Sequence, residues 1–500
     1  MGEQWPDRGC CFLYLLVKSP AIFALENRTG KRVVIIMVHL FENHGYKIAL
    51  DVDSGSVHVV DDLVYELIPQ VEEMLAAGAG DAEIAAALGG GLMDLERKEA
   101  VAEILELKNA GALFSKDEYE AQVAQFTKRE AVVKAMCLHI AHACNLGCKY
   151  CFAGEGEYYG PCGLMSLEVG KQALDYLVAH SGGRRNLEVD FFGGEPLLNW
   201  EVVKQLVQYG RELEKTHDKN FRFTLTTNGT LLTDEIMEFV NKEMSNLVLS
   251  IDGRQEVHDR MRPYHNGKGS HAEIVPKYIK AAESRGQMNY YVRGTYTHFN
   301  TDFAEDVLYL ADQGFEQISV EPVVAQPTEA YALTQEDVPE LLKQYDKLAD
   351  EMLKRRKEGR PFNFFHFMID LEGGPCVYKR LSGCGAGCEY VSVTPWGDIY
   401  PCHQFVGQPE FLLGNVKDGI QNTKLRDEFH DCNVYSKPSC KDCFAKYYCS
   451  GGCMANSQHF SGNIYGAYEI GCTLQRKRIE CAIMLKAAES LEDSEGGEEL

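Results

Sequence analysis

The stretch Cys144-Asn145-Leu146-Gly147-Cys148-Lys149-Tyr150-Cys151-Phe152 places three cysteines in a C-x3-C-x2-C array after a short apolar run. Three thiolates can hold three irons of a cubane iron-sulfur cluster and leave the fourth iron open to a chelating small molecule. The C-x2-C spacing also occurs in zinc sites, but a structural zinc ion asks for four ligands and this array supplies three. The stretch therefore favours a reactive iron-sulfur cluster.

Composition limits the classes of partner. The chain has 500 residues, enough for several domains, and its net charge is -24. Phosphate binding depends on clustered Lys and Arg, so this charge argues against a nucleic-acid partner and suits a basic peptide or a soluble redox donor.

The 18 cysteines lie on a large acidic chain without a convincing export signal, so we interpret them as metal ligands in a reducing cytoplasm. Residues 10–17 are apolar, but Lys18 and Pro20 interrupt them well before the ~20 residues that span a bilayer. We expect no membrane segment and a cytoplasmic protein.

Strand-like apolar runs alternate with amphipathic helical stretches over residues 135–330. The runs are 135–140, 187–192, 221–227, 246–251, 290–296 and 317–322. Six such units predict an α/β fold with a parallel sheet and helices outside, a partial (β/α)6 barrel. Ligands of parallel barrels collect at the carboxyl ends of the strands, and the three cysteines follow the first strand.

Polar motifs follow the other strands. Gly193-Gly194-Glu195-Pro196 comes after the second strand, where two glycines let backbone approach a ligand and a carboxylate can accept from a ligand ammonium. Further candidates near strand ends are Asn228, Ser250, Asp252 and Arg293. Each of these could instead belong to a turn or a surface ion pair.

Together, the cysteine array with Tyr150 before its third cysteine and the GGEP sequence resemble the radical S-adenosylmethionine (SAM) superfamily. The resemblance implies that Cys144, Cys148 and Cys151 hold a [4Fe-4S] cluster that binds and cleaves SAM to a 5'-deoxyadenosyl radical, which abstracts a hydrogen atom. It further implies that GGEP contacts the SAM amino group, and that polar groups at Asn228, Ser250, Asp252 and Arg293 take its ribose and carboxylate.

A second set of cysteines lies near the C-terminus, at Cys384, Cys388, Cys402, Cys440, Cys443, Cys449, Cys453 and Cys472. Their order resembles the SPASM extension of radical SAM peptide maturases, which houses two auxiliary [4Fe-4S] clusters. The resemblance assigns Cys440, Cys443, Cys449 and Cys472 to one cluster and Cys384, Cys402 and Cys453 to the other. Cys388 either completes the latter or leaves one iron open to a substrate thiolate. The alternative is a double zinc module.

Residues 37–115 predict a small N-terminal domain. Alternating apolar residues at 46–52 and 57–60 indicate a β-hairpin, and helices are expected at 61–77, 81–88 and 95–110. The pattern is similar to the winged-helix recognition element of enzymes that modify ribosomally made peptides, whose leader peptide adds a strand to a sheet edge. A dimerisation or purely structural domain is the alternative.

The remaining boundaries are expected as follows. Residues 1–36 form an extension, either from a miscalled start before Met37 or as a targeting arm, and 116–134 form a linker helix. Bridging helices occupy 331–375, the SPASM domain 376–482, and an acidic tail 483–500, in which Glu489 to Leu500 are expected to be disordered.

Several sequences together resemble the maturases of peptides with six cysteines in forty-five residues (SCIFF), notably Gly383-Cys384-Gly385-Ala386-Gly387-Cys388. This likeness implies an enzyme that forms thioether crosslinks in a cysteine-rich precursor peptide bound through its leader, with reduced flavodoxin or ferredoxin as electron donor. Asp370 and Glu372 are candidates to deprotonate a substrate thiol. The alternatives are a formylglycine-generating enzyme similar to anaerobic sulfatase maturases, and a non-catalytic iron-sulfur or zinc scaffold that binds peptides.

Overall fold

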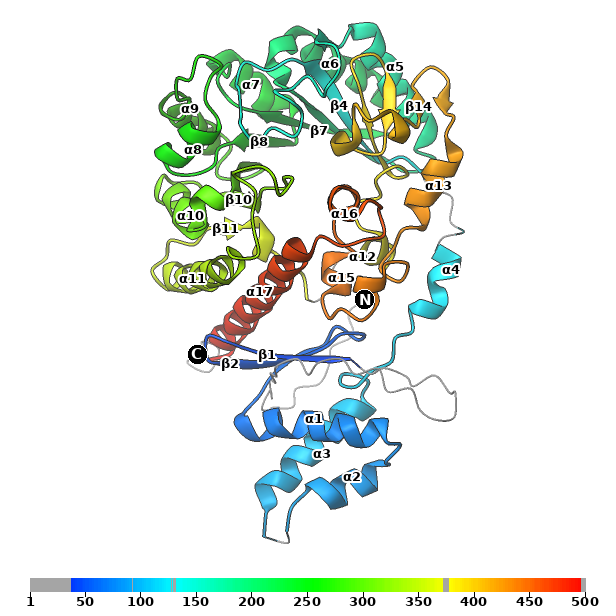
Figure 1. Cartoon of the computed structure of the whole chain (residues 1–500), viewed down its shortest axis with the longest axis vertical. Coiled ribbons are helices and arrows are strands. Elements are labelled where there is room, and N and C mark those ends of the chain that lie inside the picture. Colours follow the sequence, from blue (N-terminus) through cyan, green and yellow to red (C-terminus); the bar gives the residue numbers. More distant parts are fainter. Residues whose placement is uncertain (1–36, 92, 127, 129–131, 372–376, 496–500) are drawn as a thin grey trace.

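The computed structural model describes residues 37–91, 93–126, 128, 132–371 and 377–495 (Figure 1). The expected extension 1–36 and Glu372 lie outside these residues. A small sheet with three helices, at the bottom of the figure, contacts a larger body built on one long curved sheet. In the described part of the chain, no helix is long and apolar enough to cross a membrane.

The N-terminal sheet is antiparallel and consists of β1 (Val38–Asn43), β2 (Tyr46–Asp51) and β3 (Val57–Val59), in that order. The β2–β3 hairpin is as expected, whereas β1 is an additional strand. The turn from β1 to β2 uses His44 and Gly45, both at positive φ (51° and 80°), as a two-residue hairpin turn of the type that matches strand twist.

Both faces of this small sheet are covered. Val38, Leu40 and Ala49 pack with α1 (Asp62–Ala76), α2 (Asp81–Leu88) and α3 (Leu95–Asn109). Ile48 and Leu50 face the core of the main body instead. Successive strand residues point to opposite faces, so two apolar faces become buried and fix the domain against the body.

The expected linker helix is wrong for residues 116–119, which are not helical. One 3-10 turn, η1 (Glu120–Gln122), and the short α4 (Val123–Phe126) follow. The reason is Asp117, whose carboxylate accepts from the N–H groups of Tyr119 and Glu120 and also from Tyr435 and Lys446. Such a side-chain-to-backbone bond favours a turn over a continuing helix.

The six expected strands form the central sheet, and their neighbours pair in parallel. They are β4 (Ala135–His142), β6 (Asn186–Gly193), β7 (Asn220–Thr227), β8 (Asn246–Ser250), β9 (Tyr290–Tyr296) and β10 (Gln317–Pro322). The fold is therefore α/β with a mostly parallel central sheet, as the sequence predicts.

Helices cover the outer face of this sheet (Figure 1). They are α5 (Leu167–His180), α6 (Trp200–Thr216), α7 (Asp234–Glu243), α8 (Gln255–Met261), α9 (His271–Ser284) and α10 (Phe303–Asp312), with 3-10 turns η2 (Pro196–Asn199) and η3 (His298–Asn300). Buried Val189, Phe223 and Leu249 occupy one face of their strands, whereas Asp190, Thr224 and Ser250 alternate with them and stay partly accessible. The sheet thus has an apolar outer face and a polar concave face.

The sheet extends beyond the six strands on both sides. At one edge, β11 (Asn363–Phe364) pairs with β10. At the other, β12 (Tyr390–Val393) pairs in parallel with β4, and antiparallel β13 (Asp398–Tyr400), β14 (Gly414–Asn415) and β15 (Gly419–Ile420) follow; β5 (Gly163–Leu164) pairs with β4. The C-terminal region therefore continues the same sheet.

The C-terminal region is otherwise built from short helices and one long one. They are α12 (Val377–Ser382), η5 (His403–Phe405), η6 (Pro409–Phe411), α13 (Thr423–Asp431), α14 (Pro438–Lys441), α15 (Lys446–Cys449), α16 (Met454–Ser461) and α17 (Glu469–Glu495).

Two expectations for helices need correction. The described part of 331–375, residues 331–371, contains one long helix, α11 (Val338–Lys357), followed by β11 and the 3-10 turn η4 (Phe365–Phe367), instead of several bridging helices. The start of the expected acidic tail is helical, because α17 extends to Glu495. Its Glu489 and Glu492 pair with Arg356 and Lys357 in the basic last turn of α11, which offsets their charge.

Candidate functional site

The loop with Cys144, Cys148 and Cys151 follows the carboxyl end of β4 and is clamped by the segment after α8. The N–H groups of Gly147 and Lys149 donate to the carbonyls of Pro263 and Met261, both at 2.9 Å. Leu146 is 1% exposed and forms a β-bridge with Tyr264. The backbone between the cysteines is therefore fixed by contacts that do not involve their thiols.

The three thiols lie close enough together to affect one another. Burial, together with a smaller effect of negative charge on Glu195 and the neighbouring cysteines, raises the pKa of Cys144 to about 12, and burial with the charges of Cys144 and Cys151 raises that of Cys148 to about 12. Deprotonating all three thiols therefore needs a strongly cationic group between them, which is what iron supplies. In the described part of the chain, no group of three His, Cys, Asp or Glu side chains is placed to hold a single metal ion. A cubane cluster does not need this arrangement, because each thiolate binds a different iron.

Gly193 and Gly194 bring the end of β6 against the backbone that leads to Cys144. Gly194 and Glu195 donate from their N–H groups to the carbonyls of Ala141 and Ala143 at 2.8 and 2.9 Å. A Cβ at Gly193 or Gly194 would lie 2.3 or 2.1 Å from those same carbonyl oxygens, and Gly193 has φ +122°. Only glycine fits this close approach, and Pro196 then begins η2.

Glu195 is fully buried, and its carboxylate ties the end of β7 to this loop. It accepts from the N–H groups of Leu197 and Asn228 and from the hydroxyl of Thr227, at 2.8–3.0 Å. Burial raises the pKa of Glu195 to about 7. The carboxylate thus already has three donors from the chain, and its expected contact with a ligand ammonium stays a prediction.

Asn228 lies beside the first cysteine. Its Nδ2 donates to Asn145 Oδ1 at 2.9 Å and lies 3.7 Å from Cys144 Sγ. Ser250, in contrast, takes part through its backbone: its carbonyl accepts from the hydroxyl of Tyr278 at 3.2 Å. The structure brings Asn228 to the cysteine loop.

Asp252 is fully buried and holds the cysteine loop through Tyr150. The Tyr150 hydroxyl contacts both carboxylate oxygens at 2.7 and 2.6 Å, and the N–H of Thr295 donates to Asp252 at 3.0 Å. Arg262 donates from Nε at 2.9 Å and stacks on the Tyr150 ring. We did not predict Arg262, since no motif spacing distinguishes it from the other arginines of 254–262.

Arg293 lies on the concave face of β9 in a different group of residues. Its partner is Glu321 at 2.5 Å. Burial alone would raise the pKa of Glu321, but the charges of Arg293, His366 and Arg478 lower it to about 2. These contacts link Arg293 to the polar groups of β10 and α17, and no described contact joins it to the cysteine loop.

Seven of the eight C-terminal cysteines named above fall into two groups by their effects on one another's pKa, and their assignment to clusters stays a prediction. Charges on Cys384 and Cys453 raise the pKa of Cys402 beyond the effect of its burial, so these three thiols are neighbours. Cys440, Cys443, Cys449 and Cys472 affect one another in the same way. Their soft thiol donors fit iron-sulfur clusters.

Cys388 does not join either group. It is buried, and its Sγ donates to the carbonyl of Arg426 at 3.2 Å. Apart from burial, the groups that affect its pKa are Arg426, Asp427, Glu389 and Asp431, none of which is a cysteine. The set of Cys384, Cys402 and Cys453 therefore does not include Cys388, whereas the buried Cys432 lies near both Cys384 and Cys440.

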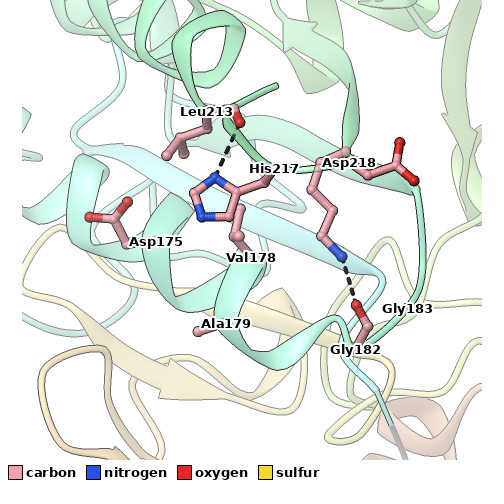
Figure 2. Close-up of a pocket in the computed structure, with 9 residues that line it drawn as sticks. Asp175, Val178, Ala179, Gly182, Gly183, Leu213, His217 and Asp218 are labelled. Carbon is pink, nitrogen blue, oxygen red and sulfur yellow. Dashed lines mark hydrogen bonds between the residues drawn. The ribbon is translucent and has the colours of Figure 1, made fainter. Parts of the chain in front are cut away.

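A pocket of about 520 Å³ lies beside the loops that lead into β6 and β7, at the amino ends of these strands (Figure 2). It is lined by α5, α6 and the loops that precede β6 and β7, with His217 and Asp218 at its rim. Lys219 donates to the carbonyls of Gly182 and Arg184, and His217 to that of Leu213. Because it lies at the amino ends of the strands, this pocket is remote from the cysteines.

Comparison with known proteins agrees with this geometry. The model of the Radical SAM superfamily matches residues 138–284, from within β4 to the end of α9. The cysteine-type anaerobic sulfatase-maturating enzyme of Clostridium novyi is 27% identical over 340 residues, covering 63% of this chain and 86% of that protein. Radical SAM cyclopropyl synthase TigE of Paramaledivibacter caminithermalis is 23% identical over 383 residues, covering 70% and 74%. Native anSMEcpe with bound AdoMet has a similar fold, with a TM-score of 0.58 at 20% identity over 71% of this chain and 98% of that one.

Proposed function

We propose that this radical SAM protein, a homologue of peptide maturases, forms thioether bonds between cysteine sulfur and carbon in a ribosomally made, cysteine-rich precursor peptide. The observation that supports it most is the arrangement of the thiols. One set of three thiols, Cys144 with its partners, lies near Tyr158. The other set of three, Cys384 with its partners, lies near Tyr390, and a set of four thiols comes later in the chain.

The residues fit three [4Fe-4S] clusters. Cys144, Cys148 and Cys151 would hold the first, Cys384, Cys402 and Cys453 the second, and Cys440, Cys443, Cys449 and Cys472 the third. When loaded, the first cluster with bound SAM supplies a 5'-deoxyadenosyl radical that removes a hydrogen atom from the peptide. Because Cys388 faces Arg426, a cluster held by Cys384, Cys402 and Cys453 would keep one coordination position for a substrate sulfur.

The chain's own residues prepare this reaction. Tyr150, Asp252 and Arg262 fix the loop of the first set, and Glu195 ties the end of β7 to it. The concave face between the sets is polar and partly accessible, so an extended peptide can lie along it. A reduced flavodoxin or ferredoxin would donate the electrons.

The N-terminal sheet offers a place for the leader peptide. Both faces of the sheet are buried, and β1 also contacts α17, whereas β3 is an edge of the sheet and only half-buried. His58 pairs with Ala49 of β2, and alternation turns the N–H and C=O groups of Val57 and Val59 away from β2. An extended peptide can pair with these groups.

Formylglycine formation is the second candidate, favoured by the likeness to the cysteine-type sulfatase-maturating enzyme of Clostridium novyi. Mass spectrometry of a cysteine-rich peptide encoded nearby distinguishes the two, after anaerobic incubation with the reconstituted chain, SAM and reductant. A thioether product loses two hydrogens per crosslink, keeps its sulfur and loses an alkylatable thiol. A formylglycine product loses its sulfur and reacts with a hydrazide, which would replace our proposal, and an unmodified peptide would contradict both candidates.

A further inference from the structure

A row of polar side chains crosses the concave face of the sheet at one level. In register, Ser392 of β12 lies opposite Cys137 of β4, Cys137 opposite Asp190 of β6, Asp190 opposite Thr224 of β7, and Thr224 opposite Asn246 of β8. Asp190 is the acidic member of the row. We had no role for it from the sequence.

The carboxylate of Asp190 is only partly engaged. Oδ1 accepts from the hydroxyl of Thr226 at 3.1 Å, and Oδ2 accepts no hydrogen bond from the described residues. The side chain is half-buried, so it is not sealed in the core. Burial raises the pKa of Asp190 to about 7, although the Thr226 bond and the charge of Arg293 act in the opposite direction.

Asp190 lies near two tyrosines that are themselves close to the two sets of three thiols. Beyond the effect of burial, charges on Cys137, Cys151, Cys144 and Asp190 raise the pKa of Tyr158, so this ring lies near both the first set and Asp190. Charges on Cys137, Cys402 and Asp190 likewise raise the pKa of Tyr390, which lies on the side of the second set. Asp190 is therefore the carboxylate of this row that lies close to side chains beside both sets.

Other acids and bases near this face are less suited to take up a proton at neutral pH. Glu321 is paired with Arg293 and has a pKa of about 2. Burial lowers the pKa of His366 to about 3 and that of His403 to about 4. Glu188 is paired with Arg222 at 3.0 Å, and Asp370, a candidate from the sequence, is exposed outside the barrel strands.

We propose that Asp190 is a catalytic residue that accepts the proton of the substrate thiol. The inference rests on the proposed function, because it assigns one step of that reaction. Forming a thioether breaks one C–H and one S–H bond and makes one C–S bond. The hydrogen atom of C–H goes to the 5'-deoxyadenosyl radical, the S–H proton goes to the Asp190 carboxylate, and the remaining electron goes to an iron-sulfur cluster.

The test compares Asp190→Asn with the unsubstituted chain, using a precursor peptide deuterated at its non-exchangeable carbons. Asn has the same shape but cannot accept the proton. We expect deuterium to enter 5'-deoxyadenosine in both proteins, whereas thioether formed per 5'-deoxyadenosine falls at least tenfold in the variant. Glu188→Gln, two residues earlier on the same strand and face, is the matched control and should keep the ratio of the unsubstituted chain.

The pH profile adds a readout that a structural role would not change. With Asp190 present, the amount of thioether formed per 5'-deoxyadenosine should rise through about pH 7 as the carboxylate ionises. The charged or titratable groups that face Asp190 are Cys137, Tyr158, Tyr390 and Arg293. In Asp190→Asn the residual ratio should rise only near pH ~8.5, where the substrate thiol ionises by itself. Iron content and circular dichroism report folding of each variant.

The results for Asp190→Asn and for the unsubstituted chain test the role of Asp190 and the proposed function separately. If Asp190→Asn keeps the ratio and pH profile of the unsubstituted chain, or loses 5'-deoxyadenosine formation together with the product, Asp190 is not the proton acceptor and the proposed function stands. If the unsubstituted chain forms no sulfur-carbon bond, the proposed function itself fails.

Discussion

At the scale of single residues, the site depends on contacts to the cysteine loop that lie outside its thiols. Tyr150 is the clearest case, because its hydroxyl contacts both oxygens of the buried Asp252. The sequence places Tyr150 and Asp252 among the site residues, and the structure shows that they bind each other. Sequence could not show this pairing, since the two residues are 102 positions apart and meet only when β4 and β8 join one sheet.

Tyr150→Phe should loosen the loop that carries Cys144, Cys148 and Cys151 without affecting the two C-terminal cysteine sets. Removing the hydroxyl costs roughly 1–2 kcal/mol, because one hydrogen bond to a buried carboxylate is lost. We expect the variant to lose iron from the first set several-fold faster in a chelator challenge followed by electron paramagnetic resonance. Tyr209→Phe removes a similar bond to the exposed Asp175 and should have no effect. Equal iron loss in both variants would show that Asp252 does not position the loop through Tyr150.

At the scale of elements, periodicity predicts the regular parts of the fold well. All six parallel strands lie where apolar runs of the right length predict them, because each strand buries one face against helices. The short strands β11 and β12–β15 gave no such signal, being two to four residues long. The helical part of 483–495 was missed because charge alone was taken as a sign of disorder, whereas Arg356 and Lys357 of α11 pair with it.

The edge strand β3 provides the prediction at this scale. Proline at Val59 removes one outward N–H group and leaves the bonds to β2 intact, and proline is tolerated at such an edge position. Val59→Pro should weaken binding of a leader-containing peptide by about tenfold, the effect of losing one to two hydrogen bonds. Fluorescence anisotropy with a labelled peptide measures this. A leaderless peptide should bind both proteins alike, and unchanged affinity for the leader would exclude β3 as its partner.

At the scale of the whole molecule, the N-terminal domain is joined to the last cysteine set by buried charges. Lys446, which is 3% exposed, lies between Asp53 and Asp117 at 3.0 and 2.9 Å, and Tyr447 donates to both carboxylates. Lys446 is in the segment between Cys443 and Cys449. The sequence could not reveal this contact, because its partners come from the hairpin, the linker and the C-terminal region, and only the complete fold brings them together.

Lys446→Met should therefore release the N-terminal domain from the body. The substitution leaves Asp53 and Asp117 without their cation, and breaking a buried pair costs roughly 3–5 kcal/mol. Faster hydrogen exchange in β2 and β3, measured by mass spectrometry on the full chain, would report the release. Lys441→Met removes the partly exposed pair with Glu120 and should cost less than ~1 kcal/mol. Equal protection in the two variants would mean that apolar packing alone holds the domain.

We predict that the cysteine set after β4 initiates hydrogen abstraction from a peptide. The most direct measurement follows deuterium from a precursor peptide, labelled at its non-exchangeable carbons, into 5'-deoxyadenosine formed by the reconstituted chain with SAM and reductant. We predict labelled 5'-deoxyadenosine with the unsubstituted chain and none when Cys144, Cys148 and Cys151 are all replaced by Ala. Unlabelled 5'-deoxyadenosine beside a modified peptide, or label transfer that survives the triple replacement, would contradict it.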